Sequence, residues 1–382
     1  MSALVLAAAA LAAWLYLLLL RGFFWLPRLL PSAPAPATWP RVAAIVPARD
    51  EAATIGTAIA SLLAQDYRGE FSVVLVDDHS SDGTARIARQ AAEQAGASAR
   101  LAIVAAGPLP PGWTGKLWAM NEGVASLEQA GVAPDLLLFT DADIAHHHEN
   151  LSSLVAALVA QKRDLVSLMV KLRCAAWAER FLIPAFVFFF AMLYPFAWVN
   201  DPRRRTAAAA GGCMLMRREA LHRSGGLAAI RDALIDDCAL ASAVKQSGGA
   251  LLLAMTQETR SLRPYPRIAD IWAMVARTAY TQLGHSPLAL IGTVAGLAAL
   301  YLAPPLLVLA GGLPAALGLA AWALMAASYA PMLRFYRCSL AWAPLLPLIA
   351  AVYLGATIDS ARRYYAGTGG AWKGRVQWQS QR

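Results

Sequence analysis

The stretches FSVVLVDD (residues 71–78) and LLLFTDAD (residues 136–143) decide the fold, because each is a short apolar run that ends in two aspartates. An apolar run of this length predicts a buried β-strand. Carboxylates that follow such a strand lie at the carboxyl edge of a sheet, where open α/β folds bind their ligands. The two stretches therefore predict an acidic edge suited to a metal-bound ligand that carries phosphate.

Strands and helices are expected to alternate around these stretches. The apolar patterns predict strands at 41–47, 71–76, 100–104 and 136–140 and helices at 48–65, 85–96 and 117–131, the first beginning with an acidic turn. This alternation predicts an α/β fold with a Rossmann-like, mostly parallel sheet. No GxGxxG motif follows the first strand, so the sequence gives no support to a dinucleotide site.

The composition predicts that part of the chain lies in lipid. The 382 residues are 58% hydrophobic and 15% charged, with a mean hydropathy of +0.47, which is too apolar for an ordinary soluble enzyme. Residues 4–20 form an apolar run with no basic residue before it, whereas Arg21, Arg28 and Arg41 follow it. This asymmetry predicts an uncleaved anchor whose downstream side is cytoplasmic.

The predicted domain order follows from these apolar ends. It comprises an N-terminal transmembrane anchor (1–26), a proline-rich linker (27–40), a cytoplasmic domain (41–285), C-terminal membrane helices (286–360) and a basic tail (361–382). Residues 288–333 predict two spans with a turn near Gly311 and Gly312, and residues 340–358 predict a third. A third crossing would place the basic tail outside, against the positive-inside rule. Whether the last segment re-enters or the rule fails here stays open.

The net charge of +9 is carried mainly by arginine. No lysine-rich tail or aromatic RNA-binding signature is present, so a membrane surface is the expected partner and nucleic acid is not. The four cysteines, Cys174, Cys213, Cys238 and Cys338, lack metal-ligand spacing and are expected to be reduced thiols with packing roles.

Five motifs carry a resemblance to a known family. They are IVPARDE (45–51), VDDHSSDGT (76–84), DADI (141–144), GGCMLMRREAL (211–221) and IDDCAL (235–240). In this order, across residues 42 to about 283, they resemble the family 2 glycosyltransferases with a GT-A fold. The resemblance implies a nucleotide-sugar donor, expected to be UDP-linked, and a divalent cation, Mg²⁺ or Mn²⁺.

The resemblance also implies a role for individual residues. The donor would be bound by Pro47, Arg49, Glu51, Asp77, Asp78, Lys116 and Asp141, the metal by Asp143 and Asp141, and the acceptor side would include Gly211, Gly212 and Arg277. Simpler interpretations stand beside these: a helix cap for the DAD motif, an Asx turn for the aspartates after the second strand, and a solvated position for the lysine.

The same resemblance implies that Asp237, in the IDDCAL motif, is the catalytic base. An inverting transfer needs one carboxylate that removes the acceptor proton on the side opposite the leaving diphosphate. A divalent cation held by oxygen ligands would neutralise the charge on that diphosphate. Asp236 is the alternative base, because the motif match could be shifted by one residue.

Apolar residues 181–199 are long enough to span a membrane. A single crossing would place Asp143 and Asp237 on opposite faces of the bilayer, so the segment is predicted to be interfacial or re-entrant. The consecutive histidines 146–148 are predicted to lie in a loop and not to form a zinc site, with His146 alone reaching the candidate site. Trp113 and Trp118 are either core residues or sugar platforms.

One departure from the family pattern narrows the expected acceptor. Many membrane-bound relatives carry Q/R-x-x-R-W after the base, whereas here Arg277 is kept, with Met274 and Thr278 at the flanking positions. A processive polymer synthase is therefore not expected. The chain looks more like hopanoid-biosynthesis-associated glycosyltransferases and, more distantly, ceramide glucosyltransferases. These imply a lipid acceptor (hopanoid, sphingolipid or polyprenol) at the cytoplasmic face of a bacterial-type inner membrane. The alternatives are a metal-dependent nucleotidyltransferase and a non-catalytic membrane scaffold.

Overall fold

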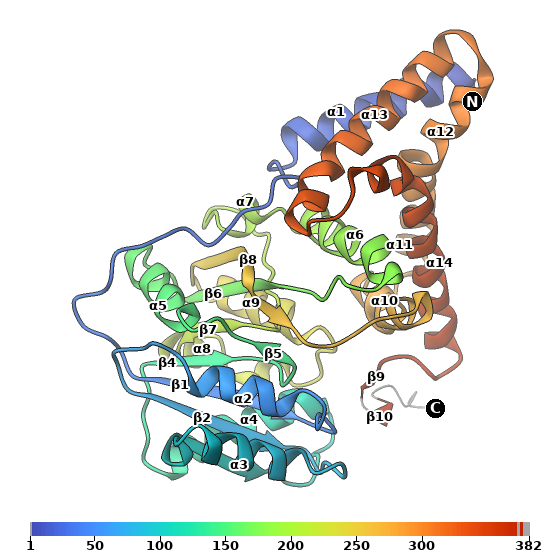
Figure 1. The fold of residues 1–382 in the computed structure, drawn as a ribbon. Helices are drawn as coiled ribbons and strands as arrows, with labels where there is room; N and C mark the ends of the chain where they lie inside the picture. The colour runs from blue at the N-terminus through green and yellow to red at the C-terminus, as the bar shows by residue number, and fades with distance from the viewer. Residues whose placement is uncertain (1, 373–374, 377–382) are drawn as a thin grey trace. The chain divides into compact units, whose positions relative to one another are not determined.

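The computed structural model describes residues 2–372 and 375–376, so part of the predicted basic tail lies outside the described residues. The chain forms two compact units (Figure 1). The α/β unit comprises Arg28–Leu172 and Trp198–Arg263, and the helical unit comprises Met1–Pro27, Arg173–Ala197 and Pro264–Arg382. The predicted linker from Arg28 onward therefore belongs to the α/β unit. The residues after Arg263 belong to the helical unit.

The α/β unit is built on one sheet with interspersed helices. Its strands are β1 Val42–Ala48, β2 Phe71–Asp77, β3 Leu101–Ala105, β4 Leu136–Phe139, β5 Ile144–Ala145, β6 Leu165–Lys171, β7 Met214–Arg217 and β8 Leu251–Ser261. Its helices are α2 Ile55–Leu63, α3 Thr84–Gln94, η1 Ser98–Arg100, α4 Gly115–Gln129, α5 Asn150–Ala160, α8 Arg218–Arg223, η2 Leu227–Ile230 and α9 Asp236–Gln246. The short helix α7, Phe196–Val199, begins in the helical unit and ends in the α/β unit.

The sheet is mixed and mostly parallel, as predicted. Its strand order is β3-β2-β1-β4-β7-β6-β8-β5. The β1, β2, β3 and β4 strands pair in parallel, whereas β7 pairs antiparallel with both β4 and β6, and β5 pairs antiparallel with β8. Pro47 is tolerated in β1 because the β1–β4 ladder ends at Ile45 and Phe139, before its missing N–H would be needed.

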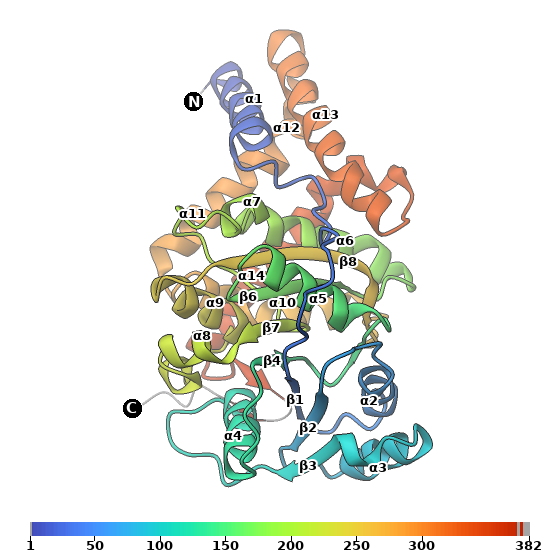
Figure 2. The same ribbon diagram turned by 90° about the vertical axis from the view of Figure 1, so that its left-hand side faces the viewer.

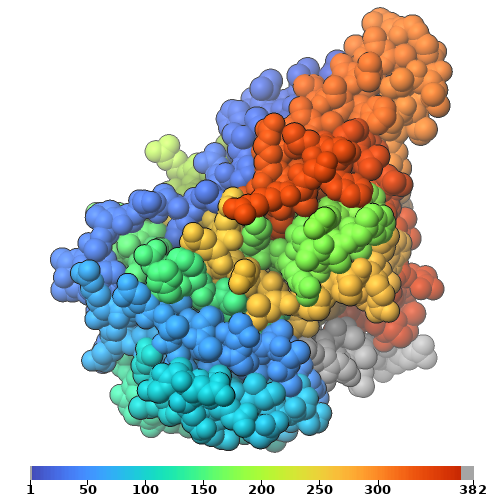
Figure 3. All heavy atoms as spheres, in the orientation of Figure 1, coloured from blue at the N-terminus to red at the C-terminus, as the bar shows by residue number. Residues whose placement is uncertain are grey.

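Helices cover both faces of this sheet (Figure 2). Alternate β1 residues point to opposite faces of the sheet. On one face Val46 packs in the same core as Ile55 and Ile59 of α2. Burial of each of these side chains stabilises the fold by about 1.5–3 kcal/mol. Helix α3 contributes to the same core and packs beside α2, and Figure 3 shows the residues of these two helices next to each other. On the other face α4 comes so close that a Cβ at Gly123 would lie 2.6 Å from Ile45 Cγ2.

The helix expected at 48–65 begins later than predicted, at Ile55, without acidic residues in its first turn. The backbone amides of Asp50 and Glu51 instead donate hydrogen bonds to side chains in the segment after β2. The Asp50 amide donates to Ser80 Oγ at 3.0 Å, and the Glu51 amide donates to Thr84 Oγ1 at 2.9 Å. Asp50 has a positive φ of 49°. These bonds satisfy backbone donors outside the helix and join the loops after β1 and β2.

The helical unit contains α1 Ala3–Leu20, α6 Trp177–Leu193, α10 Ile268–Gln282, α11 Pro287–Leu297, η3 Ala298–Leu302, α12 Ala303–Leu307, η4 Val308–Ala310, α13 Gly312–Phe335, η5 Leu340–Leu345, α14 Leu346–Tyr365 and the short strands β9 Ala371–Trp372 and β10 Arg375–Val376. Among the described residues, four stretches of this unit are long and apolar enough to cross a membrane: Ala3–Leu20, Pro287–Ala310, Gly312–Phe335 and Leu340–Tyr365. The predicted turn lies at Gly311 and Gly312, whose φ values are 71° and 55°.

The segment predicted to be interfacial forms α6, which has 17 residues and is not among the four membrane-length stretches. Aromatic contacts hold it within the helical unit. The ring centroids of Phe188 and Tyr329 lie 5.4 Å apart, and the Tyr353 hydroxyl donates to the Leu182 carbonyl at 2.9 Å. The four cysteines are free thiols, although Cys174 and Cys338 approach to 3.5 Å between sulfurs. The interfacial position of α6 stays a prediction.

Candidate active site

The parallel pairing of β1 with β2 and β4 brings the predicted aspartates to one edge of the sheet. Asp77 ends β2 and Asp78 follows it, while Asp141 and Asp143 follow β4. Asp236 and Asp237 form the first turn of α9, where the helix dipole favours negative charge.

The residues after β2 form a compact turn. Asp78 is 1% exposed, and Arg49 donates to its backbone oxygen at 2.8 Å while approaching its carboxylate at 3.6 Å. Asp77 accepts a bond at 3.1 Å from the amide of Ser80, three residues on, and this bond closes a local turn after β2. The structure therefore places Pro47, Arg49 and both aspartates together at the ends of β1 and β2.

Lys116, near the start of α4, joins two parts of the acidic edge. Its amine lies 2.8 Å from Asp141 Oδ1 and 3.0 Å from Asp236 Oδ2. Burial alone would lower the pKa of Lys116, but the two carboxylates outweigh it, so its pKa is raised and the amine stays charged. With a side chain only 19% exposed, Lys116 is not the solvated lysine of the simpler interpretation.

Asp237 is held by backbone donors. Its Oδ2 accepts a bond from the Gly211 amide at 2.8 Å, and its Oδ1 accepts one from the Cys238 amide at 2.7 Å. Burial, with Asp236 second, raises the pKa of Asp237 to about 6. A Cβ at Gly211 would lie 3.2 Å from Lys116 Nζ and 3.4 Å from Asp237 Oδ2, so a side chain here would crowd both groups.

Asp143 binds a residue that sequence reasoning missed. Arg263 Nε lies 2.7 Å from Asp143 Oδ2, and its Nη2 lies 2.6 Å from Glu51 Oε1. Arg263 follows β8, which pairs with β5 directly after the DAD motif. A contact across 120 residues leaves no local pattern, and only the β5–β8 pairing could have pointed to it.

These residues form a connected group that we call the acidic cluster. It contains the carboxylates of Glu51, Asp141, Asp143, Asp236 and Asp237 and the cations of Lys116 and Arg263. The carboxylates outnumber the cations. The pKa of Asp141 is raised, first by burial and then by Asp143 and Asp236, against the opposing effect of Lys116. A divalent cation would relieve this repulsion.

The acidic cluster fits such a cation by its charge and by its oxygen donors, which Mg²⁺ and Mn²⁺ prefer. Asp141 and Asp143 would hold it. In the described part of the chain, no three His, Cys, Asp or Glu side chains are already gathered as a metal centre. Both aspartates are instead ion-paired with protein cations.

The three histidines lie after β5 in a loop, as predicted. His146 Nε2 is 2.9 Å from Thr140 Oγ1, which also donates to the Gly212 carbonyl at 2.8 Å. Burial lowers the pKa of His146 to about 4, so its ring is neutral. His146 therefore supports the end of β4 and the loop at Gly212.

Other predicted residues lie outside this cluster. Trp113 and Trp118 pack edge to face with centroids 5.3 Å apart, and the Trp118 indole donates to Gly107 at 3.1 Å. Arg277 lies on α10 in the helical unit and is exposed. It stays a predicted acceptor-side residue.

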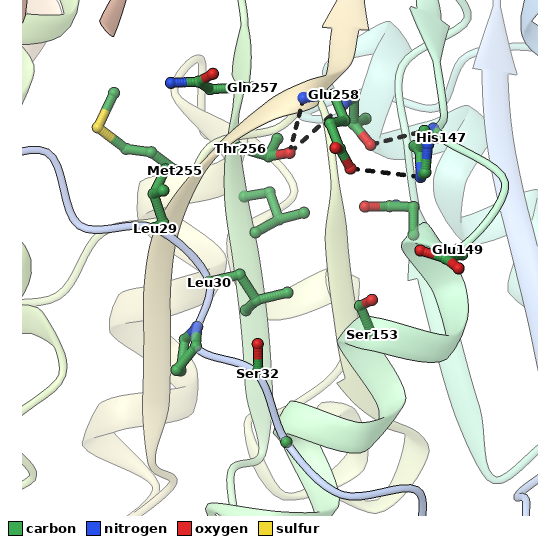
Figure 4. A pocket seen from close by; sticks show the side chains of 15 residues that line it. Leu29, Leu30, Ser32, His147, Glu149, Ser153, Met255, Thr256, Gln257 and Glu258 are labelled. Carbon is green, nitrogen blue, oxygen red and sulfur yellow. Dashed lines mark hydrogen bonds and ion pairs between the residues drawn. The ribbon is translucent and has the colours of Figure 1, made fainter.

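A separate pocket of about 490 Å³ lies in the α/β unit (Figure 4). The linker residues 29–33 form one side of it, and His147, 3.4 Å from Glu258, forms another. It contains none of the residues of the acidic cluster, so it is distinct from the candidate active site.

The fold of this chain is also found in a known protein. A mannosyltransferase from Pyrobaculum calidifontis, in complex with GDP-mannose and Mn²⁺, is 23% identical, with a TM-score of 0.59 over 94% of this chain and 99% of that chain. A glucosyl-3-phosphoglycerate synthase from Mycobacterium tuberculosis, in complex with Mn²⁺, UDP-glucose and phosphoglyceric acid, is 18% identical over 68% of this chain and 87% of that chain, with a TM-score of 0.41. At these identities the likeness concerns the fold.

A search of curated proteins gives no significant match. The family model described as "Glycosyltransferase like family 2" matches residues 40–280, which include every residue of the acidic cluster. The chain is a glycosyltransferase and belongs to this family.

Proposed function

We propose that the protein is an inverting glycosyltransferase that moves a sugar from a nucleotide donor, UDP-linked, to a lipid hydroxyl at the cytoplasmic membrane face. The observation that carries the proposal is the arrangement around Lys116. One amine ion-pairs with Asp141 on the donor side and with Asp236, next to the half-buried Asp237. Lys116 thereby connects the proposed donor site, at Asp141, with the segment that carries the proposed base, Asp237.

The residues divide the chemistry between them. Asp78 and Arg49 would bind the nucleoside, and Lys116 would pair with the diphosphate, whose charge grows as the glycosidic bond breaks. Asp141 and Asp143 would hold a divalent cation, which supplies further positive charge to the same leaving group. Asp237 would accept the proton of the acceptor hydroxyl as its oxygen attacks the anomeric carbon.

A raised pKa suits Asp237 to that task. A carboxylate with a pKa of about 6 is a stronger base than an ordinary aspartate, yet it is ionised at neutral pH. The two amides that bind it, from Gly211 and Cys238, orient the carboxylate without neutralising it. Asp236 lies in an ion pair with Lys116, which leaves it a weaker candidate.

The lipid acceptor is supported by the helical unit of the same chain. Four stretches of that unit are long and apolar enough to cross a membrane. The chain passes into this unit directly after Arg263, a member of the acidic cluster. Sequence resemblance favours a hopanoid, with sphingolipid and polyprenol acceptors as further members of the class. A bacterial-type inner membrane, crossed several times, is the corresponding location.

The proposal can be tested with the purified full-length protein in detergent. It should be incubated with a panel of nucleotide sugars, Mn²⁺ and total membrane lipid, and the lipids analysed by mass spectrometry. We expect one lipid class to gain the mass of one sugar. Asp237→Asn should form this product about 10²–10⁴ times more slowly, whereas the exposed-site control Asp66→Asn should form it at the normal rate. No sugar-dependent lipid product with any donor would contradict the proposal.

A further inference from the structure

Arg263 forms a bridge between two buried carboxylates. Its guanidinium lies 2.7 Å from Asp143 and 2.6 Å from Glu51, whose side chains are 10% and 11% exposed, while its own side chain is 34% exposed. Glu51 belongs to the loop after β1, and Asp143 follows β4. A single cation thus joins a predicted donor-binding residue to the predicted metal carboxylate.

The backbone fixes this position. Ile144 of β5 pairs with Ser261 of β8, and the Leu262 amide donates to the Asp143 carbonyl at 2.7 Å. Arg263, the next residue, is therefore held beside Asp143 by the strand register. A planar guanidinium can bind two carboxylates from different directions, which the point charge of a lysine does less well.

A divalent cation and Arg263 would compete for the same carboxylate. If a cation binds Asp143, its positive charge repels the guanidinium beside it, so the pair of Arg263 with Asp143 weakens. Removing Arg263 from its partners without a new anion would lose two charge-assisted bonds. The diphosphate of a nucleotide donor is an anion of the kind that a guanidinium binds with two parallel bonds.

We propose that Arg263 is an internal counter-cation for Asp143 and Glu51, that it competes with the divalent cation, and that it pairs with the donor diphosphate when displaced. The proposal rests on the proposed function, because it takes the donor to carry a diphosphate. It implies that the metal and the nucleoside diphosphate favour each other's binding, since each compensates for the loss that the other causes. Arg263 would thus touch the substrate and also control access to Asp143.

Direct binding measurements test this without turnover. Mn²⁺ affinity should be measured by electron paramagnetic resonance in the absence of nucleotide, and UDP and GDP affinities by calorimetry with Mn²⁺. In Arg263→Gln we expect Mn²⁺ alone to bind about three- to tenfold more tightly and the nucleoside diphosphate about tenfold more weakly, as expected for loss of one competing charge and one charge-assisted contact. Arg263→Lys should lie between the two proteins in both affinities.

Two further measurements make the test specific. The control Arg223→Gln removes a comparable ion pair, with Asp164 at 2.7 Å, and should leave both affinities unchanged. In EDTA, Arg263→Gln should melt at a lower temperature than wild type, and Mn²⁺ should raise its melting temperature by more. If Arg263→Gln does not fold, the intermediate affinities of Arg263→Lys carry the test.

The outcomes separate this proposal from the proposed function. If the wild type binds Mn²⁺ and a nucleoside diphosphate but the Arg263 variants bind both with unchanged affinity, the counter-cation role is wrong and the proposed function is unaffected. If both affinities fall together, Arg263 does not compete with the metal, which also overturns the proposal. If the wild type binds no nucleoside diphosphate, the proposed function and this inference both fail.

Discussion

Asp237 and Asp236 are neighbours in sequence but lie in different electrostatic surroundings. Asp237 accepts bonds from two backbone amides, whereas Asp236 is ion-paired with Lys116. If Asp237 is the base, Asp237→Asn keeps the shape and loses the basicity. We expect turnover to fall by about 10²–10⁴, with nucleoside diphosphate affinity within a few fold of wild type.

Asp236→Asn is the matched comparison for this prediction. Its effect on turnover should be smaller, because it alters a partner of Lys116 and not the proton acceptor. Initial rates and calorimetry on both variants decide between them. An inactive Asp236 variant beside an active Asp237 variant would move the assignment by one residue.

The raised pKa of Asp237 predicts a pH dependence. Burial raises this pKa above the ordinary aspartate value of 3.8 to about 6, and a base acts only when it is ionised. Activity should therefore be full above pH 7 and fall as the pH decreases through 6, by about tenfold per unit well below it. A profile of kcat/KM against pH measures this. Activity that stays constant down to pH 4.5 would show that no such group is required.

Asp143 provides the metal prediction. Asp143→Ala should abolish transfer and weaken nucleoside diphosphate binding in Mn²⁺, because a carboxylate ligand is lost. Asp66→Asn, which changes an exposed aspartate, is the control. Unchanged turnover in the Asp143 variant, or full activity in excess EDTA, would be incompatible with the metal assignment.

At the scale of residues, the sequence was most informative where candidate functional side chains come directly after an apolar strand. The aspartates after β2 and β4 could be predicted from apolar runs that end in carboxylates. Lys116 was predicted only by resemblance, and the structure adds its two carboxylate partners. Arg263 could not be predicted, because its partners lie 120 and 212 residues away and depend on strand register.

The elements with a strong apolar pattern matched the prediction closely. Strands β1, β2, β3 and β4 and helices α3 and α4 lie within a few residues of their predicted positions. The start of α2 was misplaced because side-chain hydroxyls in the neighbouring loop bind the backbone that a helix would have used. The two-residue β5 is too short to carry a pattern of its own.

Helix α4 makes a close approach to the sheet that can be tested at this scale. A Cβ at Gly123 would lie 2.6 Å from Ile45 and 3.0 Å from Val76, so Gly123→Ala must displace α4 or the strands. We expect a loss of about 1–3 kcal/mol in the free energy of unfolding. Ser126→Ala, on the same helix, should change it by less than about 0.5 kcal/mol. Equal denaturation midpoints for the two variants would contradict the packing.

At the scale of the whole molecule, the membrane topology depends on the acidic cluster. Lys116 binds Asp141, which precedes α6 in the chain, and Asp236, which follows it. A single crossing by α6 would separate these residues by a bilayer. We therefore predict that the chain segments before and after α6 lie on the same face of the membrane.

Cysteine labelling tests this topology. Single cysteines at Ala160 and Glu219, both exposed, should be introduced into a variant that lacks the four native cysteines. In sealed, oriented vesicles an impermeant thiol reagent should label both positions from the same side. Labelling from opposite sides would overturn the topology and the active site together.

The proposed reaction transfers a sugar, without its phosphate, to a lipid. The direct measurement uses a UDP-sugar with ¹⁴C in the sugar and ³²P in the β-phosphate, incubated with the purified protein, Mn²⁺ and membrane lipid. We expect ¹⁴C to enter the organic phase while ³²P stays in water as nucleoside diphosphate, in equal amounts. In Asp237→Asn both should form about 10²–10⁴ times more slowly. Transfer of ³²P to the lipid together with ¹⁴C, or release of both labels into water as sugar 1-phosphate, would contradict this expectation.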